Sequence, residues 1–191
     1  MLVKKYLPLI VGGICFFILL ALQIAGEGFF QSKDKEARKE RRKKELEALF
    51  ISTEMTTTPP SSIKYNLKEV KSPLILINFW ASWCVPCLEE FPALTRLRSR
   101  FDEKDLLIIG INNDMEDGLN KIKKIEKKYK LNFPSVPDLE GEITDRFDVE
   151  NLPATILYAN GKAVFFKDGP LKFDSDEFVG RIKSHLKSSR N

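Results

Sequence analysis

The sequence predicts an α/β fold with a mixed central sheet flanked by helices, preceded by one N-terminal transmembrane helix. Apolar runs at 74–79 and 106–111 have the length of buried strands, and amphipathic segments follow both of them. Later in the chain, two short apolar runs flank Asn160-Gly161, a dipeptide that favours a tight hairpin. An order of strand, helix, strand, helix, hairpin and helix predicts a mixed sheet with helices on both faces.

The N-terminal region, residues 1–26, is predicted to be a membrane anchor. Leu7 to Ala25 is almost wholly apolar, and as a helix this run would extend about 28 Å, close to the thickness of a hydrocarbon core. No convincing cleavage site follows it, so an uncleaved anchor is favoured over a removed signal peptide. Lys4 and Lys5 precede the run but more basic residues follow it, so the flanking charges leave the topology ambiguous.

Residues 27–62 are predicted to be a charged linker, and residues 63–191 the folded domain. Positions 31–50 mix helix formers with interleaved acids and bases, which favours a solvated helical spacer. Positions 51–62 are polar and contain Pro59-Pro60, as linkers do. The formal net charge of +4 arises entirely before Ile51. A folded domain without a basic bias argues against a nucleic-acid partner.

The remaining elements of the domain follow from local sequence patterns. An edge strand is predicted at 63–67, and strands of a hairpin at 154–159 and 163–167. Helices are predicted at about 85–101, 118–129 and 178–186, with a short helical turn at 144–147.

Cys84 and Cys87 lie at the turn between the strand 74–79 and the helix that begins near Val85. Two cysteines with this spacing and context indicate a redox site. The unpaired N–H groups and partial positive charge of a helix start should stabilise a Cys84 thiolate and lower the pKa of that thiol. Cys87, one turn further along, can close a disulfide with Cys84. A structural disulfide or half a zinc site is the alternative, but the sequence has only three cysteines and one histidine. We therefore predict no metal and no cofactor.

The segment from about Leu74 to Val164 resembles the TlpA/ResA-like membrane-anchored thiol–disulfide oxidoreductases of the thioredoxin superfamily. The similarity lies in four short runs: NFWASWCVPC at 78–87, the continuation CLEEFPAL at 87–94, LNFP with DLEG at 131–141, and NLPAT at 151–155. By this resemblance, Cys84 attacks a disulfide of the substrate and Cys87 resolves the mixed disulfide.

The resemblance also implies roles for residues around the cysteine pair. Glu90, one turn beyond Cys87 and on the same side of the helix, would handle protons. Pro153 would be a cis-proline facing the disulfide, and Leu152 would shape the substrate groove. Substrate contact is also assigned to Trp83 and Pro86 beside the cysteines. Asn78 stands where many cytosolic thioredoxins have a buried acid, which leaves Glu90 as the proton-handling candidate.

At the level of function, the resemblance implies an enzyme on the membrane whose C-terminal domain faces the periplasm or the cell exterior. It would reduce disulfides in exported proteins, with apocytochrome c as the substrate that the family suggests. A membrane thiol transporter of the DsbD/CcdA type would be its electron donor. Three alternatives stay open: an oxidant instead of a reductant, a CxxC module that carries a soft metal such as Cu(I), and a thioredoxin that faces the cytoplasm, as the charges beside the anchor would suggest.

Overall fold

The structure, a computed structural model, describes residues 23, 33–58 and 62–189. The chain divides into two compact units, Met1–Arg42 and Lys43–Asn191. In the first unit, the described residues 33–42 are helical and mostly exposed. The predicted anchor at 7–25 lies outside the described residues, Gln23 excepted. Within the described ranges, no helix is long and apolar enough to cross a bilayer.

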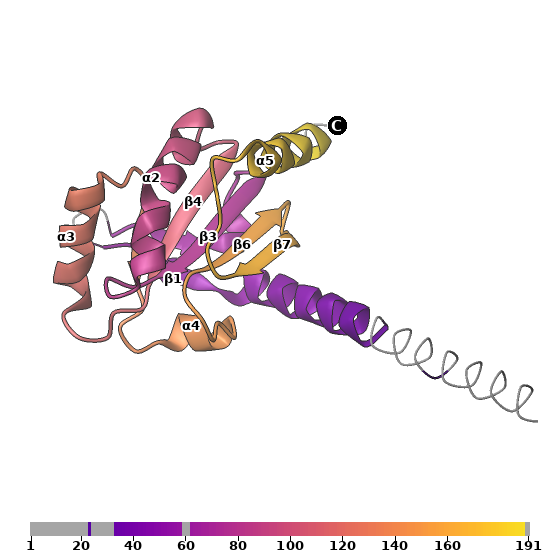
Figure 1. Cartoon of the computed structure of the whole chain (residues 1–191), viewed down its shortest axis with the longest axis horizontal. Coiled ribbons are helices and arrows are strands. Elements are labelled where there is room, and N and C mark those ends of the chain that lie inside the picture. The colour runs from indigo at the N-terminus through magenta and orange to yellow at the C-terminus, as the bar shows by residue number, and fades with distance from the viewer. Residues whose placement is uncertain (1–22, 24–32, 59–61, 190–191) are drawn as a thin grey trace, which may run out of the picture. The chain divides into compact units, whose positions relative to one another are not determined.

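The second unit contains a five-stranded mixed sheet, a separate two-stranded sheet and the helices that cover them (Figure 1). It begins with helical residues 43–52. The elements that follow are β1 (Glu54–Thr56), β2 (Lys64–Asn66), the 3-10 helix η1 (Leu67–Glu69), β3 (Leu74–Trp80), α2 (Val85–Arg100), β4 (Leu106–Asn112), α3 (Gly118–Tyr129), β5 (Ser135–Pro137), α4 (Glu142–Arg146), β6 (Ala154–Ala159), β7 (Lys162–Asp168) and α5 (Asp176–Ser189).

The large sheet has the strand order β5-β4-β3-β6-β7, with β3 at its centre. β3 pairs in parallel with β4 and antiparallel with β6, so the sheet is mixed, as the sequence predicts. Every residue of β3 and β4 is buried, which is why both strands read as continuous apolar runs. The predicted hairpin is confirmed as β6–β7, with Asn160 and Gly161 both at positive φ in its turn.

Helices cover both faces of this sheet, because successive side chains of a strand point to opposite sides. Leu74 and Leu76 of β3 belong to a core cluster that includes residues of α2, α3 and α5. Ile75 and Ile77 belong to a second cluster, with residues of helix 43–52, η1 and α4. The segment after β3, which contains Cys84 and Cys87, therefore follows a strand that is packed on both of its faces.

Residues 43–58 pack as part of the domain, although the sequence suggested a linker up to residue 62. Leu46, Phe50 and Met55 are buried, and the Tyr158 hydroxyl donates a hydrogen bond to the Leu46 carbonyl at 2.9 Å. Leu46 and Phe50 are four residues apart on one helical face, so charged neighbours can stay in water while the two side chains enter the core. The difference arises because these few apolar residues are hidden among many charged ones.

Two further differences concern short elements. β1 forms within the predicted linker and pairs antiparallel with β2, which confirms the edge strand expected at 63–67. β5 was not predicted, and it adds to the edge of the large sheet beside β4. Both new strands are three residues long, too short for an alternation of apolar and polar residues to be visible. The predicted helical turn is observed as α4, two residues earlier than expected.

Candidate active site

The sheet topology brings three loops together at one edge. Trp80 at the end of β3 is paired with Asn112 at the end of β4, because the two strands are parallel. β6 runs the other way, and its first residue, Ala154, is paired with Phe79. The turn that leads to Cys84, the segment after β4 and the Leu152–Pro153 bond therefore meet beside the same end of β3.

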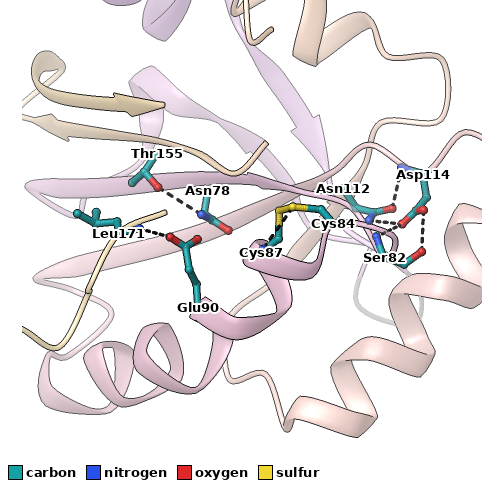
Figure 2. Close-up of a disulfide and its surroundings, with 9 residues drawn as sticks. All are labelled: Asn78, Ser82, Cys84, Cys87, Glu90, Asn112, Asp114, Thr155 and Leu171. Carbon is teal, nitrogen blue, oxygen red and sulfur yellow. Dashed lines mark hydrogen bonds between the residues drawn. A yellow bond between two sulfur atoms is a disulfide. The ribbon is translucent and has the colours of Figure 1, made fainter. Parts of the chain in front are cut away.

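Cys84 and Cys87 form a disulfide at the start of α2 (Figure 2). Cys84 is the N-cap residue, and its sulfur accepts a hydrogen bond from the Cys87 backbone N–H at 3.3 Å. The side chains are nearly enclosed, with Cys84 5% and Cys87 1% exposed. In the reduced state, the N–H that reaches Cys84 and the helix start would favour a thiolate at this sulfur.

The two tryptophans of the motif lie in opposite environments. Trp80 is fully buried and packs edge-on against Phe91, with ring centroids 5.1 Å apart. Trp83 is 66% exposed, and Val85 beside it is similarly exposed. Pro86 is exposed in the first turn of α2. Trp83, Val85 and Pro86 thus form an apolar, solvent-facing rim next to Cys84. Trp83 and Pro86 are among the residues for which the resemblance implies substrate contact.

The Leu152–Pro153 peptide bond is cis, as expected from the sequence. Pro153 is buried, and its carbonyl accepts a hydrogen bond from the Gly169 N–H at 2.8 Å. Leu152 is half-buried and packs against both core clusters. The hydrogen bond from Gly169 and the packing of Leu152 therefore hold the loop before β6 in place.

Glu90 is a buried carboxyl group one turn beyond Cys87, with only 6% of the residue exposed. Oε1 accepts a hydrogen bond from the Leu171 backbone N–H, and Oε2 has no hydrogen-bond partner among the described residues. Burial raises the pKa of Glu90 to about 7, although the hydrogen bond from Leu171 and the nearby Asn78 amide oppose the rise. This carboxyl group can therefore gain or lose a proton near neutral pH.

Asn78 is buried in the middle of β3, beside Glu90 (Figure 2). Its amide nitrogen donates a hydrogen bond to the Thr155 hydroxyl at 3.3 Å. An amide cannot transfer a proton as a carboxyl group can, so Glu90 is the group here that titrates.

A second buried carboxylate, Asp114, was not singled out from the sequence. It follows β4, and Figure 2 shows it with Ser82 and Asn112 near Cys84, while Glu90 and Asn78 lie near Cys87. Asp114 accepts hydrogen bonds from the Ser82 backbone and hydroxyl, both at 2.8 Å. The sequence signal is a polar run directly after a buried parallel strand, at the edge where the cysteine turn also begins.

The site can exchange a disulfide for two thiols. It holds a cysteine pair at a helix start, an exposed apolar rim, a cis-proline and a carboxyl group that titrates near neutral pH. Across the described part of the chain, no group of three or more His, Cys, Asp or Glu side chains could hold a metal ion. A thioredoxin-like fold with this cysteine pair defines a thiol–disulfide oxidoreductase.

Comparison with known proteins gives the family. Residues 39–167 match the AhpC/TSA family. The thiol–disulfide oxidoreductase ResA of Bacillus thuringiensis subsp. konkukian is 33% identical over 121 residues, which are 62% of this chain and 69% of that protein. ResA of Bacillus anthracis is 30% identical over 157 residues, 78% of this chain and 84% of that protein. The chain belongs to the AhpC/TSA family, among the ResA-like thiol–disulfide oxidoreductases.

Solved structures support the fold independently. A secreted Mycobacterium tuberculosis disulfide oxidoreductase, described as homologous to Escherichia coli DsbE, matches with a TM-score of 0.59 and 24% identity. The match covers 71% of this chain and 97% of that one. StoA from Bacillus subtilis matches with a TM-score of 0.56 and 20% identity, over 70% of this chain and 96% of that one. At these identities the likeness establishes the thioredoxin-like fold alone.

Proposed function

We propose that this protein is a membrane-anchored reductant that opens disulfides in exported proteins, and that apocytochrome c, the substrate to which the family resemblance points, is one candidate among them. The observation that carries the proposal is the buried Glu90 carboxyl group beside a nearly enclosed Cys84–Cys87 pair. A negative charge near a thiol pair disfavours the thiolate, and a less acidic thiol pair favours its own oxidation to the disulfide. The ResA relatives at about 30% identity support the same reaction class.

In the proposed cycle, the Cys84 thiolate attacks one sulfur of a substrate disulfide. The substrate S–S bond breaks, a mixed disulfide forms on Cys84, and the released substrate thiolate takes up a proton. Cys87 then loses its proton and attacks the Cys84 sulfur, which frees the second substrate thiol and forms the Cys84–Cys87 disulfide. The substrate gains two electrons, and the protein loses them.

Glu90 is proposed to receive the proton that Cys87 must lose. Burial raises its pKa to about 7, so an ionised Glu90 can accept a proton at neutral pH and a protonated one can return it. The exposed Trp83 and Pro86 would contact the substrate chain, together with Leu152 and Pro153.

The proposed location is the outer side of the cell membrane, with residues 7–25 as a single-pass anchor and 27–42 as its connection to the domain. The apolar composition of 7–25 supports the anchor. A tethered reductant must be re-reduced in place, so a membrane dithiol transporter of the DsbD/CcdA type is proposed as its electron donor. That donor would deliver two electrons to the Cys84–Cys87 disulfide in each cycle.

The test is a trap for the mixed disulfide. Cys87→Ser removes the resolving thiol, so substrates should stay attached to Cys84 and be identifiable after purification under acid quench. The matched control is the Cys84→Ser/Cys87→Ser double variant, which should trap nothing. Apocytochrome c or other exported proteins with paired cysteines in the trap would support the proposal, and an empty trap in cells would contradict it.

Two measurements test the direction of electron transfer and the side of the membrane on which the domain lies. A reduction potential near or below about −250 mV is expected for a reductant, whereas a value near about −120 mV would indicate an oxidant. A membrane-impermeant thiol reagent should label Cys84 in intact cells carrying the Cys87→Ser variant. Labelling only after lysis would place the domain in the cytoplasm and overturn the proposed location.

A further inference from the structure

Asp114 is a buried carboxylate that lies close to Cys84 and has no part in the exchange steps above. Its side chain is 0% exposed. It accepts hydrogen bonds from the Ser82 N–H and the Ser82 hydroxyl, both at 2.8 Å, and from the Asn112 amide at 2.7 Å. A buried charge is tolerated only where it is well paired. The three hydrogen bonds to Asp114 therefore form part of the folded structure of this loop.

The hydrogen bonds hold the turn that delivers Cys84 to α2. The Cys84 N–H is bonded to the Ala81 carbonyl at 3.1 Å, and Ser82 lies inside this turn. The start of the turn is fastened as well, because the Asn113 N–H donates to the Trp80 carbonyl at 2.9 Å. Asp114 therefore restrains the backbone immediately before the nucleophilic sulfur.

The charge of Asp114 also lies close enough to act on that sulfur. Ser82 and Cys84 are two positions apart, at most about 7 Å of chain, and the hydrogen bond adds 2.8 Å. The carboxylate thus lies within about 10 Å of the Cys84 backbone. From α3, Lys121 approaches the same carboxylate, with Nζ 3.7 Å from Oδ1. The Lys121 ammonium offsets part of the negative charge.

We propose that Asp114 is a positioning residue whose negative charge, partly balanced by Lys121, keeps the Cys84 thiol less acidic than the start of α2 alone would make it. The helix start favours the Cys84 thiolate, and a carboxylate on the preceding turn opposes that effect. A less acidic thiol forms the more stable disulfide, so the pair tunes the protein towards donating electrons. This last consequence rests on the proposed role as a reductant. Glu90, the other buried carboxyl group near the cysteine pair, acts in the same direction and stays unchanged in the test.

The experiment measures the pKa of the Cys84 thiol in the reduced full-length protein. The rate of alkylation by iodoacetamide is followed against pH by mass spectrometry, and fragment ions assign the label to Cys84 or to Cys87, because the two cysteines are three positions apart on one peptide. Asp114→Asn should lower this pKa, because it removes the charge and keeps the size of the side chain. Lys121→Met should raise the pKa of Cys84, because it removes the ammonium group that offsets the negative charge of Asp114. The shift in Asp114→Asn should be about half to one unit at a charge separation of about 10 Å, and the shift in Lys121→Met should have the opposite sign.

Matched controls change the same charges elsewhere. Glu103→Gln removes an exposed carboxylate before β4 begins, at the opposite end of the sheet from the cysteines, and Lys124→Met removes an exposed ammonium from α3 itself. Neither should move the pKa of Cys84. These controls separate a local effect from a change in the net charge of the protein.

Opposite shifts in Asp114→Asn and Lys121→Met would support the proposal. Unchanged values in both, or shifts in the same direction, would overturn it, because a merely structural role predicts no sign reversal. If Asp114→Asn does not fold, Lys121→Met decides alone: a rise supports the proposal, and no change or a fall overturns it. The measurement needs neither a substrate protein nor an electron donor, so its outcome is independent of the proposed reductase function.

Discussion

The buried Glu90 carboxyl group should make the stability of the oxidised protein fall as the pH rises through neutrality. Burial raises the pKa of Glu90 from 4.5 to about 7, so between these values the native state keeps a proton that the unfolded chain has lost. The contribution of this group to stability is complete below about pH 4.5 and is lost as the pH passes 7. A difference of about 2.5 units corresponds to a ceiling of about 3 kcal/mol.

The variant Glu90→Gln isolates this effect. Glutamine can still accept the hydrogen bond from the Leu171 N–H, but it carries no charge at any pH. The free energy of unfolding of Glu90→Gln, relative to the unmodified protein, should therefore rise by up to about 2.5 kcal/mol between pH 5 and pH 8.5. Urea denaturation of both oxidised proteins across this range measures the difference.

The control is Glu89→Gln, which neutralises the exposed carboxylate at the preceding position. Its free energy of unfolding should keep a constant offset from that of the unmodified protein across the same pH range. A constant offset for Glu90→Gln as well would refute the reasoning, because it would mean that ionisation of Glu90 has no energetic cost in the folded state.

Two other predictions concern packing. Gly110→Ala should destabilise the protein by about 1–3 kcal/mol in urea denaturation, since the new Cβ would lie 2.8 Å from Nε1 of the buried Trp80. Gly180→Ala, whose Cβ would meet nothing within 4 Å, should instead stabilise helix α5 by about 0.5–1 kcal/mol. Leu46→Ala should lower the free energy of unfolding by about 2–4 kcal/mol, because its side chain is 1% exposed, whereas Lys44→Ala, at an exposed position, should have little effect. An equal, small effect of Leu46→Ala and Lys44→Ala would mean that the domain begins after residue 46.

The sequence predicted the strands and helices whose own residues carry a clear signal: a continuous apolar run, a helical periodicity or a turn dipeptide. β3 and β4 are fully buried, so their composition alone distinguishes them, and Asn160-Gly161 fixes the hairpin. The start of the domain was not predictable in the same way. Leu46 and Phe50 are among the few apolar residues in a highly charged segment. Their packing against the sheet makes the segment part of the domain, and the sequence of the segment alone does not reveal that packing.

The candidate site likewise has parts that local sequence predicts and parts that it does not. The cysteine pair and the cis-proline lie in short runs that local sequence can identify. The environment of Glu90 depends on Leu171, which is 81 positions away in the chain. The partner of Ser82 is Asp114, which is 32 positions away and is delivered by the parallel pairing of β3 with β4. Such contacts are set by topology, and no spacing rule within one segment reveals them.

The two proposals assign each of the buried carboxyl groups near the cysteine pair to a different thiol. Asp114 is joined to the turn before Cys84 by two hydrogen bonds from Ser82, so its influence falls first on the nucleophile. Glu90 lies one turn beyond Cys87, and burial raises its pKa to about 7, so it can change its protonation state near neutral pH. In the two proposals, Asp114 acts on the Cys84 thiol through its charge, whereas Glu90 accepts and returns the proton that Cys87 exchanges.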